Sequence, residues 1–417
     1  MKRLFISDLH IGDGYATDDF SYDSELVRLL DTVLACGEDV ELVILGDGLE
    51  LIETRIVKDI GLVPFEELVD QLDERIIQSI VNEHAEVFRA FQRFSRKNSI
   101  IYVVGNHDYY MLPNRKVQNA VCEALGGRSR VQIHPYFYDE QWGVFGIHGN
   151  NFDAGNRFVK DKNGKLIPPL GDFMSRYMMV HFEEVILHTD VPESILKDYD
   201  DVRPNIEMFE WFEYVMKTYD LSINLLELWT TEMLKMLQTA YAKQWMKASF
   251  PVAHHFSKLF LNRFGGIRLG KTMVKAMSKL RSMKVTDYMK NRARKILLRG
   301  EADPEHRLKE SAFYGYCPTP EIDYTNLRGL IFGHRHRQDT LILPYDGQYK
   351  FYVNTGTWRA VVEKAPKRDQ KRFVKRSELS YIRIHDEDHE LHIETIMANR
   401  ISHDRKKPVA IQGEKVS

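Results

Sequence analysis

Five short polar motifs along the chain contain residue types that can bind metal ions. In chain order they are Asp-x-His, Gly-Asp, Gly-Asn-His-Asp, His-Gly-Asn and Gly-His-x-His. Together they offer seven carboxylate, amide or imidazole ligands, which is the number needed to hold two divalent cations that share one carboxylate. The candidate ligands are Asp8, His10, Asp47, Asn106, His148, His334 and His336.

Two cations a few ångströms apart repel each other, so a shared anion must lie between them if both sites are to stay filled. We expect Asp47 to be this bridge. The first ion would then be bound by Asp8, His10, Asp47 and His336, and the second by Asp47, Asn106, His148 and His334. Mixed nitrogen and oxygen ligands suit transition metals better than Mg or Ca. The sequence therefore predicts two divalent metal ions, with Mn as first choice and Fe, Zn or Co as alternatives.

Each motif begins directly after an apolar run that is typical of a short buried strand. Helical patterns separate the first four runs: residues 24–34 behind a Ser24 cap, a long amphipathic stretch over 64–96, and a shorter one over 113–126. This alternation predicts parallel βαβ units, in which polar residues gather at the carboxyl ends of the strands. The five apolar runs are residues 4–6, 42–45, 100–104, 144–147 and 330–332.

The alternation of strands and helices stops after the fourth motif. Residues 155–318 have apolar side chains at helical spacing, notably after Pro204, and predict a large helical insertion that forms a cap beside the metal site. Strand patterns then return, with a hairpin turn at Asp346-Gly347 and a later strand pair, which we expect to form a second, mixed sheet. The predicted domains are residues 1–154 and 319–400 for the two parts of the catalytic domain, 155–318 for the cap, and 401–417 for a flexible tail.

Composition places the chain among ordinary globular proteins. It has 417 residues, 43% hydrophobic and 28% charged, with a net charge of −2. This length exceeds the usual limit of a single core, which fits a domain with a large insertion. Three widely spaced cysteines indicate a reducing compartment, and no apolar run is long enough for a transmembrane segment. We therefore expect a cytoplasmic protein, with contact to a membrane surface as an option.

Charge is unevenly distributed within the predicted cap. Residues 181–250 contain 13 acidic and 6 basic side chains, whereas residues 251–300 contain 13 basic and 1 acidic. The basic half is either a solvated helix face that pairs with the acidic half, or a surface for nucleic acid, a nucleotide or an anionic lipid. The sequence leaves both interpretations open, and it leaves the oligomeric state open as well.

The order and composition of the five motifs resemble those of the calcineurin-like metallophosphoesterase superfamily, over residues 1–150 and 320–360. The resemblance implies an α/β fold, the four-layer α/β/β/α metallophosphoesterase sandwich, and a binuclear-metal hydrolase of phosphoester bonds. In the mechanism that we expect, a metal-bridging hydroxide attacks phosphorus, His107 gives a proton to the leaving oxygen, and Asp108 orients the His107 ring. Arg335, Arg337 and Asn150 are candidates for contact with phosphate.

A phosphodiesterase or pyrophosphatase is the first choice of activity. The segments 46–50, 333–337 and 354–358 are also similar to UDP-2,3-diacylglucosamine pyrophosphohydrolases, although those enzymes usually carry Arg in place of His107 and have a much shorter insertion. The alternatives are therefore a lipid-linked nucleotide pyrophosphohydrolase, or a nuclease that binds nucleic acid through residues 251–300. A non-catalytic, metal-binding scaffold is the alternative from another class.

Overall fold

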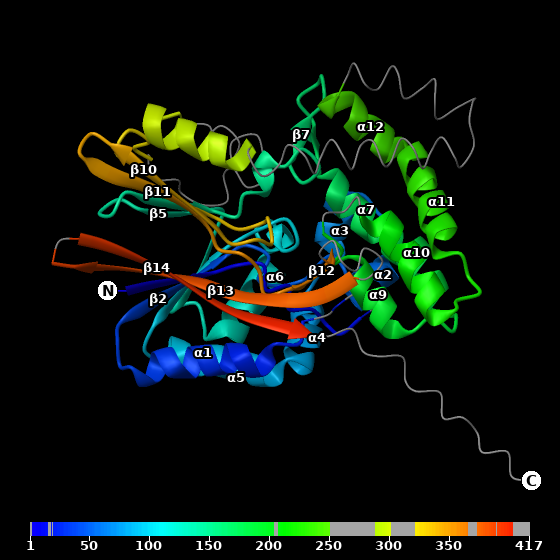
Figure 1. Ribbon diagram of the computed structural model, residues 1–417, viewed down its shortest axis with the longest axis horizontal. Coiled ribbons are helices and arrows are strands. Elements are labelled where there is room, and N and C mark those ends of the chain that lie inside the picture. The colour runs from blue at the N-terminus through cyan, green and yellow to red at the C-terminus, as the bar shows by residue number, and fades with distance from the viewer. Residues whose placement is uncertain are drawn as a thin grey trace, which may run out of the picture.

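The computed structural model describes residues 2–402 except for 16–17, 19, 204–206, 251–287, 302–321, 366–372 and 389. These residues form a mixed α/β fold with two main sheets, as Figure 1 shows, so the expected α/β class is confirmed. The end of the predicted tail, residues 403–417, lies outside the described residues. No helix in the described part of the chain is long and apolar enough to cross a membrane.

The larger sheet has seven strands in the order β12-β13-β1-β2-β3-β4, with β14 paired to β13. The four strands from β1 to β4 are parallel neighbours, as the alternation of strands and helices predicts. The apolar residues 4–6 of β1 and 42–45 of β2 are all buried, which explains why the sequence has continuous apolar runs here and not an alternating pattern. The bounds are β1 Lys2–Ile6, β2 Val40–Leu45, β3 Ser99–Val103, β4 Val131–His134, β12 Ala360–Lys364, β13 Phe373–Glu387 and β14 Glu390–Ser402.

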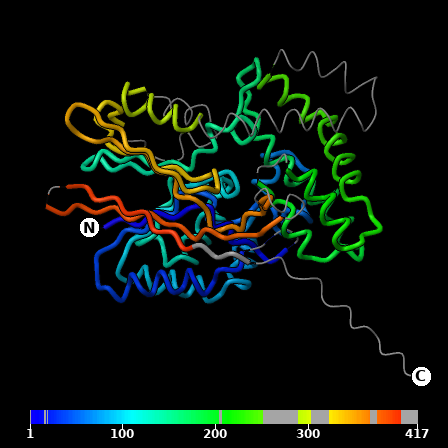
Figure 2. Tube along the Cα trace, in the orientation of Figure 1, coloured from blue at the N-terminus to red at the C-terminus, as the bar shows by residue number. Residues whose placement is uncertain are grey.

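One strand pair belongs to a different sheet from the one expected. The sequence predicted that β13 and β14 complete the second sheet, but β13 pairs with β1 and so extends the first sheet. Ile382 and Ile384 of β13 are fully buried in the core between the two sheets, beside Phe5 of β1. Figure 2 shows this neighbourhood, in which the N-terminal strand runs next to strands from the far end of the chain.

The smaller sheet has five strands in the order β10-β11-β9-β6-β5. Strands β6, β9 and β11 are parallel neighbours, and β10 and β11 form the predicted hairpin. Its turn residues Asp346 and Gly347 have φ of 48° and 73°, the left-handed values that favour Asp-Gly in a tight hairpin turn. The bounds are β5 Phe137–Asp139, β6 Val144–Ile147, β9 Gly329–Phe332, β10 Asp339–Tyr345 and β11 Gln348–Asn354.

The two sheets pack face to face through an apolar core that includes Val43 and Val103 from the larger sheet and Ile331 and Val353 from the smaller one. Helices cover the outer face of the larger sheet, and a helix over residues 288–299 contributes to the core on the outer side of the smaller one (Figure 1). The helices along the larger sheet are α1 Asp23–Ala35, α4 Arg75–Glu83, α5 Ala85–Ser95 and α6 Arg115–Leu125.

Two local expectations about these helices need correction. The predicted helical stretch over 64–96 contains three separate helices, α3 Phe65–Gln71, α4 and α5, because the chain breaks at Leu72 and at His84. Helix α1 begins at Asp23, and Ser24 is not its cap, since the Ser24 hydroxyl donates to the Glu25 side chain. Helix α6 begins as expected, after Asn114, whose side chain accepts from two backbone amides of the first turn.

The described part of the segment after residue 155 is mainly helical and has its own apolar core, which includes Phe182, Phe212 and Trp229. It contacts the larger sheet, because Arg203 N donates to Val362 O of β12 at 2.8 Å. Pro204 lies outside the described residues. The elements are the short hairpin β7 Val159–Lys160 and β8 Leu166–Ile167, followed by α7 Leu170–Met178, a π-helix Met179–Glu183, α8 Glu184–Leu187, α9 Glu193–Tyr199, α10 Met208–Tyr219, α11 Leu225–Gln238 and α12 Ala240–Ser249.

Candidate metal centre

The candidate ligands lie at the carboxyl ends of strands from both sheets. Asp8, Asp47 and Asn106 follow β1, β2 and β3 of the larger sheet. His148 and the segment 334–336 follow β6 and β9 of the smaller sheet. Because the two sheets pack face to face, these loops converge at one end of the sandwich, and the candidate site is shared between the sheets.

One group of ligand atoms combines Asp8, His10 and His336, and these atoms all lie within 4.8 Å of one another. His336 Nε2 lies 3.3 Å from Asp8 Oδ1 and also 3.3 Å from His10 Nε2. All three side chains are at most 11% exposed. This group matches the set of ligands expected for the first ion, with Asp47 as its remaining member.

A second group combines Asp47, His148 and His334, again within 4.8 Å. His148 Nε2 lies 2.9 Å from Asp47 Oδ2, and the same oxygen lies 3.8 Å from His10 Nε2. Asp47 also belongs to a third group, with His10 and His107, so its carboxylate stands between His148 on one side and His10 on the other, which is the position that a bridging ligand needs. Its other oxygen, Oδ1, accepts a hydrogen bond from His107 N at 2.8 Å.

One buried atom at the site, Asn106 Oδ1, lacks a hydrogen-bond partner among the described residues. Asn106 is 7% exposed. An unsatisfied buried polar group costs about 1–3 kcal/mol, so such an atom is rare unless it serves a purpose. An amide oxygen is an ordinary ligand of a divalent cation, and the residues present therefore fit the expected metal ions.

The backbone at the candidate ligands is strained. Five of the seven have a left-handed φ between 49° and 70°, a conformation that is uncommon outside glycine. The other three non-glycine residues with positive φ in the described chain are aspartates elsewhere, including the hairpin turn at Asp346. Strain of this kind is retained where function requires it, and it turns these side chains toward a common point. The five residues are Asp8, His10, Asp47, His334 and His336.

Two glycines of the motifs are needed because ligands pass close to their backbone. A Cβ atom on Gly46 would lie 2.3 Å from His148 Nδ1, and one on Gly105 would lie 2.1 Å from Asp47 Oδ1. Both distances are far below van der Waals contact. The glycines of the Gly-Asp and Gly-Asn-His-Asp motifs therefore make room for the ligands of neighbouring loops.

Glu50 is a site residue that the sequence analysis missed. Its carboxylate lies 3.0 Å from His10 Nδ1 and 2.6 Å from His107 Nδ1, and it is 2% exposed. Burial opposes its ionisation, but the charge of His107 and the contacts with both histidines hold the pKa of Glu50 well below its usual range. The available signal was a charged residue within the otherwise apolar run from Leu49 to Ile52.

Among the described residues, the contacts found for the Asp108 carboxylate are not with the His107 ring that it was predicted to orient. The carboxylate accepts hydrogen bonds from Gly48 N at 2.9 Å, Gly105 N at 2.6 Å and Tyr102 Oη at 2.6 Å. Burial and the nearby charge of Asp47 raise the pKa of Asp108 to about 7. Asp108 thus holds two ligand loops together, and Glu50 is the carboxylate that contacts the His107 ring.

Burial and neighbouring charges shift the pKa values of the site's histidines in opposite directions. For His107 and His148, burial disfavours the charged ring and would lower the pKa. The neighbouring carboxylates, chiefly Glu50 for His107 and Asp47 for His148, have the larger and opposite effect. They raise the pKa of His148 to about 9 and that of His107 well above its ordinary value. Burial dominates at His336 and lowers its pKa to about 3, which favours the neutral ring that a metal ligand requires.

The predicted phosphate contacts differ in their surroundings. Arg337 is exposed and Arg335 is half-buried, whereas Asn150 is buried and donates from Nδ2 to Asn156 O. The turn over residues 354–358 contacts two of the ligand loops. In this turn Thr357 Oγ1 donates to Asp8 O at 3.1 Å, and Asn354 Nδ2 donates to Gly333 O at 2.6 Å.

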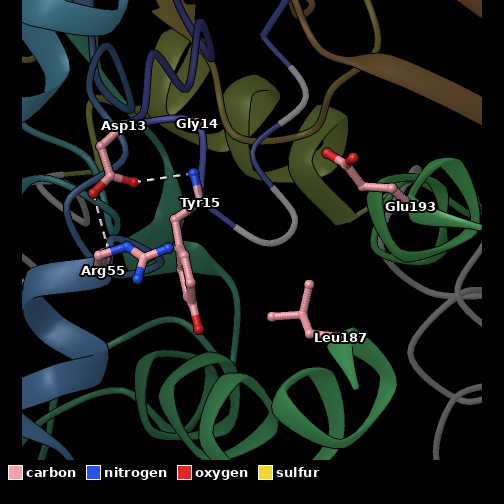
Figure 3. Close-up of a pocket in the computed structure, with 6 residues that line it drawn as sticks. All are labelled: Asp13, Gly14, Tyr15, Arg55, Leu187 and Glu193. Atoms are coloured by element: carbon pink, nitrogen blue, oxygen red, sulfur yellow. Dashed lines mark hydrogen bonds between the residues drawn. The ribbon is translucent and has the colours of Figure 1, made fainter. Parts of the chain in front are cut away.

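A cavity of about 230 Å³ lies between the loop that follows His10 and the helices after residue 155 (Figure 3). The guanidinium of Arg55 stands 4.9 Å from the centre of the Tyr15 ring. Leu187, which is 42% exposed, faces this pair across the cavity. The cavity therefore has the cationic and aromatic pair of Arg55 and Tyr15 on one side and apolar Leu187 on the other, with the acidic residues Asp13 and Glu193 also in its lining. The lining residues are Asp13, Gly14, Tyr15, Arg55, Leu187 and Glu193.

Comparison with known proteins agrees with this geometry. The sequence profile described as calcineurin-like phosphoesterase matches residues 1–222, which is more than half of the chain and includes four of the five motifs. The fifth motif lies beyond the match, but the structure brings its histidines to the other four. No curated protein matches the chain. The chain belongs to the calcineurin-like phosphoesterase family, whose name denotes hydrolases of phosphoester bonds.

Proposed function

We propose that this protein is a phosphodiesterase or pyrophosphatase with two divalent metal ions, Mn being the first choice. The observation that carries the proposal is the position of Asp47 Oδ2, which lies 2.9 Å from His148 Nε2 and 3.8 Å from His10 Nε2. A single carboxylate oxygen between two groups of ligands is what a pair of cations requires. The proposed ligands are Asp8, His10, Asp47, Asn106, His148, His334 and His336.

Divalent ions at such a site supply Lewis-acid activation of water and neutralise charge on the phosphoryl oxygens. The protein's own contribution is the proton for the leaving group. Glu50 contacts His107 Nδ1, so in this proposal Nε2 is the nitrogen that gives the proton to substrate, and the His107 side chain is 15% exposed. Because the carboxylates of Glu50 and Asp47 overcome the effect of burial and raise the pKa of His107, the ring stays protonated at neutral pH and can act as general acid.

We further infer that the layers of the described fold correspond to the four-layer α/β/β/α sandwich, and that residues 155–318 form its cap. The packing of the two sheets and the helices on their outer faces support this inference. The cavity beside Tyr15 and Arg55, which the helices α8 and α9 help to form, supports a substrate site between the catalytic domain and the cap.

The substrate class has three alternatives. Exposed Val185 and Leu187 on α8, with Leu187 in the cavity wall, favour an amphiphilic substrate and keep the lipid-linked nucleotide pyrophosphate among them. The nuclease alternative depends on residues 251–300, of which 251–287 lie outside the described residues. A non-catalytic scaffold remains the alternative from another class. It has no need of strained, unsatisfied ligands in a buried position.

The experiment is a turnover screen of the Mn-loaded protein with a p-nitrophenyl monoester, a p-nitrophenyl diester, nucleotide pyrophosphates and DNA. We expect turnover of the diester or pyrophosphate that is abolished by a chelator and by Asp47→Asn. Asp59→Asn, at an aspartate whose side chain is 65% exposed, is the matched control. Hydrolysis of the monoester alone would overturn the substrate class, and full activity of Asp47→Asn would overturn the metal centre.

A further inference from the structure

A carboxylate outside the predicted motifs contacts one of the candidate ligands. Asp153 Oδ2 lies 3.2 Å from His334 Nε2, and both side chains are 12% exposed. An ionised carboxylate can only accept a hydrogen bond, so the nitrogen that faces it must carry the proton. In a neutral ring the other nitrogen, Nδ1, then has the free lone pair. The contact therefore determines which nitrogen of His334 is available to a cation.

The Asp153 carboxylate is itself held in place by its own loop. Gly155 N donates to Oδ1 at 3.0 Å, and Asn156 Nδ2 donates to Oδ2 at 2.9 Å. The Asn156 amide is farther from the His334 ring, with its Nδ2 at 3.5 Å from His334 Nε2. Hydrogen bonds to ionised groups are stronger than those between neutral groups. The shorter contact, with the Asp153 carboxylate, therefore determines that His334 Nε2 carries a proton.

Two other histidines of the centre have the opposite arrangement. The Nδ1 atom of His10 contacts the Glu50 carboxylate at 3.0 Å, and the Nδ1 atom of His148 contacts Leu45 O at 3.0 Å. Both rings thus carry the proton on Nδ1 and direct Nε2 into the site, where His148 Nε2 lies 2.9 Å from Asp47 Oδ2. His148 Nε2 faces Asp47, which is itself one of the clustered ligands, whereas His334 Nε2 faces Asp153, which is not among those found in the described chain.

Asp153 is not one of the clustered ligand atoms. The group of Asp47, His148 and His334, whose ligand atoms lie within 4.8 Å of one another, does not include it within the described chain. Asp153 is nevertheless on the same loop as His148, five residues later, at the start of the predicted cap. The same loop therefore carries His148, a proposed ligand of the second ion, and Asp153, which contacts the ligand His334.

We propose that Asp153 is a positioning residue that fixes His334 in its Nε2-protonated form, so that His334 binds the second metal ion through Nδ1. This inference rests on the proposed binuclear function. Outer carboxylates of this kind typically contribute about 10–100-fold to metal affinity, by orienting the ring and increasing its basicity. The segment after residue 150 thus takes part in the metal centre and does more than cover it.

The first test measures binding of Zn²⁺ alone to the metal-free full-length chain by titration calorimetry. We expect the wild type to bind two ions, and Asp153→Asn to bind one of them about 10–100-fold more weakly while the other is unaffected. Asp161→Asn is the matched control, because Asp161 also accepts backbone amides of its own turn, from Asn163 at 2.8 Å, but has no contact with the centre among those described. It should bind both ions as the wild type does.

The second test needs no change at Asp153 and so does not depend on whether that variant folds. Long-range ¹H–¹⁵N correlation spectra of the Zn-loaded wild type report which imidazole nitrogen holds the proton, and His334→Gln identifies the signals of His334. We expect His334 to be protonated at Nε2 and His10 and His148 at Nδ1. A proton on Nδ1 of His334, or unchanged affinity for both ions in Asp153→Asn, would overturn the inference. Failure of the wild type to bind two ions would instead overturn the proposed centre.

Discussion

Replacing Glu50 by Gln should shift the pH dependence of catalysis, because this carboxylate is the group that holds the proposed acid in its charged form. Glu50 Oε2 lies 2.6 Å from His107 Nδ1, and both groups are shielded from water, with side chains 3% and 15% exposed. Gln keeps the shape of the side chain and removes its charge. The acid must be protonated to work, so activity is lost as the pH rises through the pKa of His107.

The size of the shift follows from the contact. An opposite charge within about 4–6 Å changes a pKa by about 1–3 units. After burial, Glu50 is the largest contribution to the pKa of His107, and Asp47 remains in the variant. We therefore expect the alkaline limb of the kcat profile to move down by about 1–3 pH units in Glu50→Gln.

The assay is a kcat profile from pH 5 to 10 for an alkyl phosphodiester and for its p-nitrophenyl counterpart, with metal content measured in parallel. Only the alkyl ester needs a proton on its leaving group, so only its profile should move. Glu66→Gln, at an exposed glutamate of α3, is the control. Equal changes for both substrates, or an unmoved alkaline limb at full metal content, would refute the assignment of His107 and Glu50.

Three further predictions concern the support of the site. Asp172→Ala should destabilise the fold by about 3–5 kcal/mol in urea unfolding, because it leaves buried Arg176 without the carboxylate that its Nε contacts at 2.9 Å. Glu183→Gln should raise Tm more at pH 8 than at pH 5. Burial raises the pKa of Glu183 well above 4.5, so the fold loses stability as the pH rises from 4.5 toward that raised value, and Gln removes this loss. Gly105→Ala should abolish metal binding in calorimetry, since its Cβ would lie 2.1 Å from Asp47 Oδ1.

The residues that converge at the site could be predicted because each follows an apolar run. Such a run is typical of a buried parallel strand, and the polar residue after it marks the end of that strand. Asp8, Asp47 and His148 were found in this way. The membership of the strands in two different sheets could not be predicted. The apolar runs of β1 and β9 are equally buried on both faces, and nothing in either run specifies which strand lies beside it.

The partners of the histidine rings were harder to predict for a geometric reason. The sequence suggested Asp108 as the partner of the adjacent His107, but adjacent residues in a tight turn direct their side chains to different sides. The Asp108 carboxylate faces the backbone of Gly48 and Gly105, while Glu50, on another loop, faces the ring. Such pairs depend on how two loops meet, and only the folded structure contains that information.

The contacts of the segment after residue 150 bear on how the catalytic loops are held. Asp172 of α7 accepts hydrogen bonds from Tyr109 Oη at 2.5 Å and from Tyr110 Oη, which directly follow the Gly-Asn-His-Asp motif. Asp153, from the same segment, contacts His334 Nε2 at 3.2 Å. A ligand loop with left-handed, strained residues persists only if its surroundings determine it fully. We therefore infer that this segment helps to hold the strained residue His334 and the loop after β3, so that its removal would disorder the centre and not merely open it.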